Sequence, residues 1–113
     1  MDKIERTLDL IASDKSVEEL IVALGDNASG LGFDELTDAQ KSIEGSKWWT
    51  RHSAEIKKLI CSKAGSSEVT DTLTKDLVQL AFGVLGAKYG AGIATYAVAI
   101  AIRHVIDGWC ETP

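Results

Sequence analysis

Four side chains of this chain could bind a metal ion or act as nucleophiles, namely His52, Cys61, His104 and Cys110. Two thiolates and two imidazoles are a ligand set that a structural zinc ion takes. Eight residues separate His52 from Cys61 and five separate His104 from Cys110, however, and paired zinc ligands usually lie closer together in sequence. A Cys–His nucleophile pair is not expected either, because His104 and Cys110 would face different ways on a helix. The sequence therefore predicts no metal site, no cofactor and no enzymatic activity.

The cysteine count and the N-terminal segment bear on the cellular location. Two cysteines in a chain of 113 residues do not form a disulfide framework. The opening segment, MDKIERTLDLIASDK, is too polar to be a secretory signal. We therefore expect a cytoplasmic protein in which Cys61 and Cys110 are free thiols.

A tandem pair of tryptophans is the clearest candidate for an interaction site. Adjacent residues on a helix point about 100° apart, so Trp48 and Trp49 cannot be buried in the same direction. We expect Trp49 to lie on the core side with His52, and Trp48 to lie at the boundary beside Arg51. An exposed tryptophan next to an arginine is typical of an interaction anchor. The alternative is a partly covered structural tryptophan.

The charges are unevenly distributed along the chain, whose formal net charge is −5. Residues 1–47 carry eleven acids and five bases, a net −6, whereas residues 48–113 carry six acids and seven bases, a net +1. Lys57 and Lys58 belong to a basic segment over 47–63, and Glu18 and Glu19 belong to the acidic half. Such a distribution can steer a partner of opposite charge or align copies of the same chain. A solvated helix face is the simpler interpretation, and the net negative charge disfavours nucleic acid.

The composition and the local patterns of the N-terminal half predict helices. A single proline and few aromatic residues argue against a turn-rich β fold. Residues 3–12 carry apolar side chains at helical spacing after a cap at Asp2. Ser16 and Glu19 form a capping box that begins a second helix, which we expect to end at Gly25. The glycine-rich segment 26–32 is predicted to be a loop.

The middle and C-terminal parts also read as helical. Asp34 or Thr37 is expected to cap a short helix that stops at Gly45, and an amphipathic helix should follow over about 46–64. The chain from about 69 to 109 reads as helix, and the two glycines of the KYGAG segment, 88–92, lower the helix propensity there. We expect a break or kink there, with one continuous helix as the alternative.

Small residues recur in heptad spacing within the apolar segment 77–102. On a helix they would form one stripe along which a second helix could approach closely. We predict a helix-packing seam along this stripe, made of Gly83, Ala87, Gly90, Ala94, Ala97 and Ala101. The segment is long enough to span a bilayer, but Lys88 would fall near its centre, where a charge is costly. A membrane role is therefore possible but not favoured.

These patterns predict an all-α fold with a single domain over 1–113, a compact bundle of five or six helices. A central Gly/Ala-rich C-terminal helix or helical hairpin would form its middle. The function that we expect is that of a small non-enzymatic interaction module, which binds a protein partner or self-associates. Two alternatives stay open. One is a membrane-active protein that inserts 77–102 on activation. The other is an acidic inhibitor of a basic partner surface, which would use Asp9, Asp14, Glu18, Glu19, Asp26, Asp34, Glu35 and Asp38.

Overall fold

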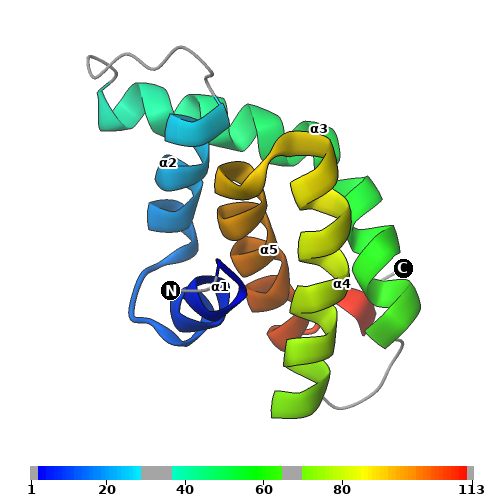
Figure 1. Ribbon diagram of the computed structural model, residues 1–113. Coiled ribbons are helices and arrows are strands. Elements are labelled where there is room, and N and C mark those ends of the chain that lie inside the picture. Colours follow the sequence, from blue (N-terminus) through cyan, green and yellow to red (C-terminus); the bar gives the residue numbers. More distant parts are fainter. Residues whose placement is uncertain (1–2, 29–36, 65–69, 112–113) are drawn as a thin grey trace.

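The computed structural model describes residues 3–28, 37–64 and 70–111, and all regular elements among these residues are helices, with no β-strand (Figure 1). The all-α prediction is confirmed. The elements in chain order are α1 (Lys3–Ala12), α2 (Val17–Ala28), α3 (Asp38–Ala64), α4 (Asp71–Tyr89), α5 (Ala91–Ile106) and the short 3₁₀ helix η1 (Trp109–Glu111).

Side-chain caps explain where three of these helices begin. The hydroxyl of Ser16 accepts a hydrogen bond from the backbone N–H of Glu19 at 3.2 Å, which confirms the cap predicted for α2. Thr37 and Gln40 cap α3 reciprocally, because each side chain accepts from the other residue's backbone N–H, at 3.1 and 2.9 Å. The hydroxyl of Thr70 caps α4 by accepting a hydrogen bond from the backbone N–H of Leu73 at 3.1 Å. The suggested caps at Asp2 and Asp34 lie outside the described residues.

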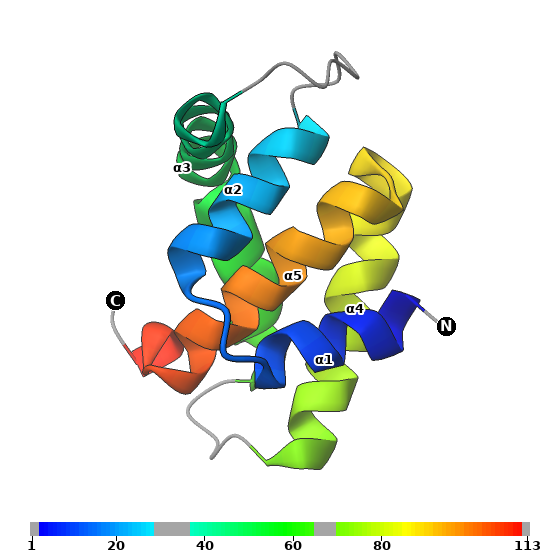
Figure 2. The same ribbon diagram turned by 90° about the vertical axis from the view of Figure 1, so that its left-hand side faces the viewer.

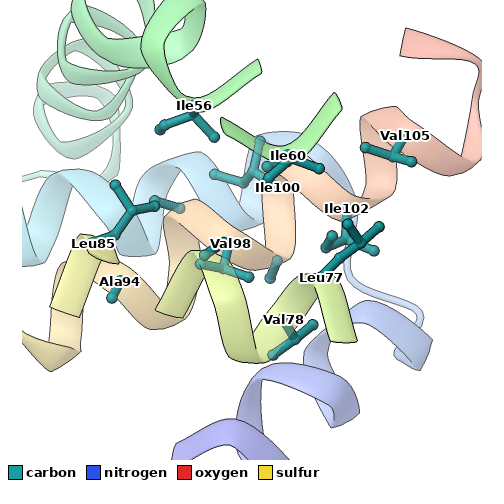
Figure 3. Packing of buried hydrophobic residues seen from close by; sticks show 14 of the residues in the cluster. Ile56, Ile60, Leu77, Val78, Leu85, Ala94, Val98, Ile100, Ile102 and Val105 are labelled. Carbon is teal, nitrogen blue, oxygen red and sulfur yellow. The ribbon is translucent and has the colours of Figure 1, made fainter. Parts of the chain in front are cut away.

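Helix α5 lies in the middle of the fold. It contacts α1, α2, α3 and α4, and Figure 2 shows it crossing the molecule between them. Its side chains from Ala97 to Ile102 are fully buried. Figure 3 shows Val98, Ile100 and Ile102 packed among side chains of α3 and α4. An apolar helix with neighbours on every side is the arrangement that such a sequence requires.

The predicted break in the C-terminal segment is confirmed. Gly90 separates α4 from α5 with a φ of 91°, in the region that favours glycine. The apolar segment is therefore a helical hairpin. No helix in the described parts of the chain is both long enough and apolar enough to cross a bilayer.

The predicted helix-packing seam is wrong as a single stripe, because the chain reverses at Gly90. Ala94, Ala97 and Ala101 are fully buried on α5. Gly83 and Ala87 are exposed on α4, and a methyl group added at Gly83 would meet no atom within 4 Å. A stripe continues along a helix only while the helix itself continues.

The close helix contact is instead between α2 and α3, at two glycines that we predicted to be helix ends. Both predictions are wrong, because α2 continues past Gly25 to Ala28 and α3 runs through Gly45. A Cβ atom added at Gly25 would lie 2.7 Å from the backbone nitrogen of Gly45 and closer still to the carbonyl oxygen of Lys41. The two helix backbones touch at these positions, and the side chain of any other residue type would collide with the neighbouring backbone. This contact explains why glycine occurs here inside a helix.

The expectation of free thiols is also wrong, because Cys61 and Cys110 form a disulfide bond. They are 49 positions apart in sequence, but the last turns of α3 lie against η1, which brings their Cα atoms to 5.3 Å. That separation is within the range that a disulfide spans. Bonds of this kind persist mainly in oxidising compartments.

Arg103 of α5 fastens α1 to the core, a role that the sequence did not reveal. Its guanidinium donates hydrogen bonds to the backbone carbonyl oxygens of Ile11 at 2.9 Å, Ser13 at 2.7 Å and Leu10 at 3.4 Å. These carbonyls belong to the end of α1, where unpaired acceptors and the negative end of the helix dipole favour a cation.

Candidate functional site

The solvent-facing side of α3 carries an open hollow of about 680 Å³. Its lining residues form two parallel rows with a spacing of four, which places each row along one ridge of the helix. One row holds small hydroxyl side chains and the other an isoleucine followed by two cations. We call this surface the α3 outer face; it consists of Ser42, Ile43, Ser46, Lys47, Thr50 and Arg51.

Apolar area and positive charge occur together on the α3 outer face. Ile43 is 54% exposed, one of the largest exposures of a bulky apolar side chain in the described residues. Lys47 has a weak, exposed ion pair with Glu44 at 3.8 Å. Arg51 and the nearby Lys58 are exposed and have no ion pair with a described residue. The surface thus offers an apolar contact beside hydroxyl donors, the weakly paired Lys47 and Arg51, which has no ion pair with a described residue.

Two aromatic groups occupy the sides of α3 that pack against the rest of the fold. Trp48 lies against His52, with ring centroids 4.4 Å apart, and against Tyr89 of α4 at 5.4 Å. Trp49 lies against His104 of α5 at 5.6 Å and against Trp109 of η1 at 5.8 Å. Each tryptophan therefore has its own direction, as the 100° rotation between neighbours requires.

The roles that we predicted for the two tryptophans need correction. Both are partly buried and packed against the core, so Trp48 is not an exposed anchor beside Arg51. His52 accompanies Trp48 and not Trp49. The partly covered structural tryptophan that we kept as the alternative matches Trp48. The reason is the α4–α5 hairpin, which places Tyr89 over the side of α3 that we expected to face solvent.

An ion pair and a hydrogen bond join α3 to the end of α4. Lys88 donates to Glu55 at 2.5 Å, and this hydrogen bond lowers the pKa of the Glu55 carboxyl and raises the pKa of the Lys88 ammonium. The Tyr89 hydroxyl lies 3.3 Å from Nδ1 of His52. Lys88, the one charge within the apolar segment, thus lies at the surface with a partner.

The other predicted interaction residues do not gather in one place. Lys57 is half-buried, with its ammonium 5.8 Å from the centre of the Trp109 ring. Lys58 is exposed on the same helix. Glu18 and Glu19 are exposed in the first turn of α2, where they complement the helix dipole, and Glu19 lies 4.0 Å from Lys15.

The sequence reasoning missed most of the α3 outer face because it ended a helix at Gly45. With α3 continuous, the signal is visible in the sequence. Positions 42, 46 and 50 are Ser, Ser and Thr, and positions 43, 47 and 51 are Ile, Lys and Arg. Both runs share the spacing of four that marks a helix ridge.

Two further observations bear on the chemistry of the chain. Among the described residues no three His, Cys, Asp or Glu side chains gather as a metal site would require. A second hollow, of about 400 Å³, lies between α1, α4 and the end of α5; it is lined by Leu8, Ile11, Ala12, Asp71, Thr74, Lys75 and Ile106. Its charged pair, Asp71 and Lys75, has opposite signs, so this hollow favours neither a cation nor an anion.

Comparison of the chain with models of protein families, with curated proteins and with solved structures finds no match.

Proposed function

We propose that this protein is a non-enzymatic interaction module that binds an acidic helix of a protein partner on the α3 outer face. The observation that carries the proposal is the exposed Ile43 beside Lys47 and Arg51 in an open hollow. A bulky apolar side chain in such a place is available to a partner, and the cations select the charge of that partner.

The shape of the surface favours a helix as the occupant. Helices pack when a ridge of one enters the groove between two ridges of the other, and the row of Ser42, Ser46 and Thr50 is low because its side chains are small. A partner helix could approach closely along this row. Its apolar side chains would contact Ile43, and its carboxylates would reach the cations on the neighbouring ridge.

The charges favour a protein partner over nucleic acid. Lys47, Arg51 and Lys58 form a small positive surface on a chain with a net charge of −5. A nucleic acid would meet repulsion from the rest of the molecule, whereas a short acidic helix would contact only the positive part. Self-association through the acidic residues of α1 and α2 remains the second form of the same proposal.

The structure bears unequally on the other functions and the location expected from the sequence. Insertion of 77–102 into a membrane would require α5 to leave the core in which residues 97–102 are fully buried. The inhibitor role stays a prediction. The cytoplasmic location also stays a prediction, and the Cys61–Cys110 bond favours an oxidising compartment as its alternative.

A peptide probe tests the proposal. The probe is a fluorescein-labelled amphipathic helix with leucine on one side and glutamate flanking it, and its control replaces each glutamate by glutamine. Fluorescence anisotropy should show binding of the acidic peptide that weakens as salt rises from about 0.05 to 0.5 M, because salt screens exposed charges. Arg51→Glu and Ile43→Ser should each weaken binding about tenfold, which corresponds to about 1.4 kcal/mol.

Lys63→Glu is the matched control, because Lys63 is an exposed cation of the same helix outside the hollow. It should leave the affinity nearly unchanged. Equal loss in the Arg51 and Lys63 variants would show nonspecific attraction and would refute the proposal, as would equal binding of the two peptides. Sedimentation velocity of the unmodified protein over the same salt range decides between a separate partner and a second copy.

A further inference from the structure

The region around η1 joins three features that the proposed function does not use. The disulfide bond ties η1 to the last turns of α3, the Trp109 ring covers the side chains of Trp49 and His104, and a glycine lies directly before η1. Figure 1 shows η1, in red, beside the C-terminal end of α3, in green, although the two are far apart in sequence.

The disulfide and the packing of Trp109 against Trp49 and His104 hold η1 in place. It contacts α3 and α5 and no other described helix. Two backbone hydrogen bonds close the turn before it, from Asp107 to the carbonyl oxygen of Arg103 at 3.2 Å and from Gly108 to that of Val105 at 3.0 Å. Gly108 has a φ of 95°, so the turn uses a conformation that glycine enters and leaves easily.

The surface beneath η1 differs from the rest of the core. Trp109 lies 5.8 Å from Trp49 and 5.5 Å from His104, and the ammonium of Lys57 is 5.8 Å from the Trp109 ring. Without Trp109, an indole, an imidazole and an ammonium would become accessible together. Cys61 and Cys110 are only half-buried, so their bond does not lie in the fully buried core.

We propose that the Cys61–Cys110 disulfide is a redox latch that holds η1 over Trp49 and His104, and that a dithiol reductant opens it. A thiolate of the dithiol attacks one sulfur of the bond and forms a mixed disulfide. The second thiol of the dithiol then displaces that sulfur. The products are two cysteine thiols and the oxidised dithiol, so two electrons and two protons pass to the protein. In the reduced protein η1 swings away about Gly108 and exposes the aromatic surface.

The latch gives the disulfide a role beyond that of a static cross-link. In an oxidising compartment the aromatic surface stays covered, and on entry to a reducing one it becomes exposed. This inference does not depend on the α3 outer face, whose residues point to another side of the same helix.

Amide exchange followed by NMR tests the latch on the full chain. Peptide mapping without reductant first establishes whether Cys61 and Cys110 are joined. On reduction with dithiothreitol, the exchange rates of the Asp107 and Gly108 amides should rise at least tenfold, while the chemical shifts of the α5 core amides stay unchanged. Acrylamide should quench tryptophan fluorescence more strongly in the reduced protein, and reoxidation should restore both readings.

Two variants separate the latch from a loss of stability. Cys61→Ala/Cys110→Ala should resemble the reduced protein and no longer respond to dithiothreitol. Trp109→Ala keeps the disulfide and should expose Trp49 without any reductant. Unchanged exchange at Asp107 and Gly108 on reduction would show a static cross-link and overturn the proposal. A change in the amide chemical shifts throughout the α5 core would also overturn it, because the bond would then hold the packing of the whole fold.

Discussion

The contact between Gly25 and Gly45 predicts that adding a single methyl group at Gly25 forces α2 and α3 apart. In Gly25→Ala the new Cβ would lie 2.7 Å from the backbone nitrogen of Gly45, and the carbonyl oxygen of Lys41 stands nearer still. These are backbone atoms, which cannot rotate away as a side chain can. The two helices must therefore move apart, and α2 makes its most extensive contact with α3.

The magnitude follows from two opposing effects. Alanine is a better helix former than glycine by about 1 kcal/mol, which favours the variant. Overpacking a tight contact costs about 3 kcal/mol or more when the backbone has to shift. The free energy of unfolding should therefore fall by about 2 kcal/mol, which lowers the Tm by roughly 8 °C for a domain of this size.

Gly83→Ala is the matched control, because Gly83 lies inside α4 and an added Cβ there would meet no atom within 4 Å. Only the helix propensity acts at this position, so the variant should be more stable by about 0.5–1 kcal/mol. Urea denaturation monitored by circular dichroism measures both changes. If Gly25→Ala is as stable as the parent or more so, the close contact does not exist and the reasoning fails.

Three further predictions concern the core and the C-terminal region. Ala94→Leu should lower the free energy of unfolding by about 1–3 kcal/mol, because Ala94 is fully buried and the larger side chain would overpack its site. Ala87→Leu, at an exposed position of α4, should change this free energy little. Thermal melts measure both variants, and equal losses would contradict the prediction. Burial lowers the pKa of His104 in the folded protein below its ordinary value near 6.5. The unfolded chain therefore binds a proton at this histidine more readily than the folded protein does, and the free energy of unfolding should fall as the pH drops from about 7 to 5. His104→Phe should flatten this fall in urea titrations, and an unchanged slope would point to other groups. Replacing both Cys61 and Cys110 by alanine should lower the free energy of unfolding by about 4 kcal/mol, since the bond closes a 49-residue separation; a loss under about 1 kcal/mol would indicate a compact unfolded chain.

Features that depend on near neighbours along the chain could be predicted from the amino-acid sequence. The all-α class follows from composition and from apolar spacing, and α1 has the predicted bounds of 3–12. The capping of α2 by Ser16 depends on residues three positions apart. The break at Gly90 follows from the low helix propensity of the two glycines in 88–92. Each of these interactions is complete within one turn of the chain, so the sequence contains all of its parts.

The roles of residues that contact distant parts of the chain could not be predicted from the sequence, because those contacts form only when the helices pack together. Gly25 and Gly45 look like helix ends in the sequence, and only the neighbouring helix shows that they are contact points. Cys61 and Cys110 became a pair because α3 and η1 meet, which no spacing of two cysteines can indicate. The candidate site shows the same division, because Arg51 was predicted as an interaction residue from its type, whereas its ridge neighbours Ile43 and Lys47 were recognised only once α3 proved continuous. Local propensity is a weak bias that packing overrides, since the free energy of a tertiary contact exceeds that of one helical residue.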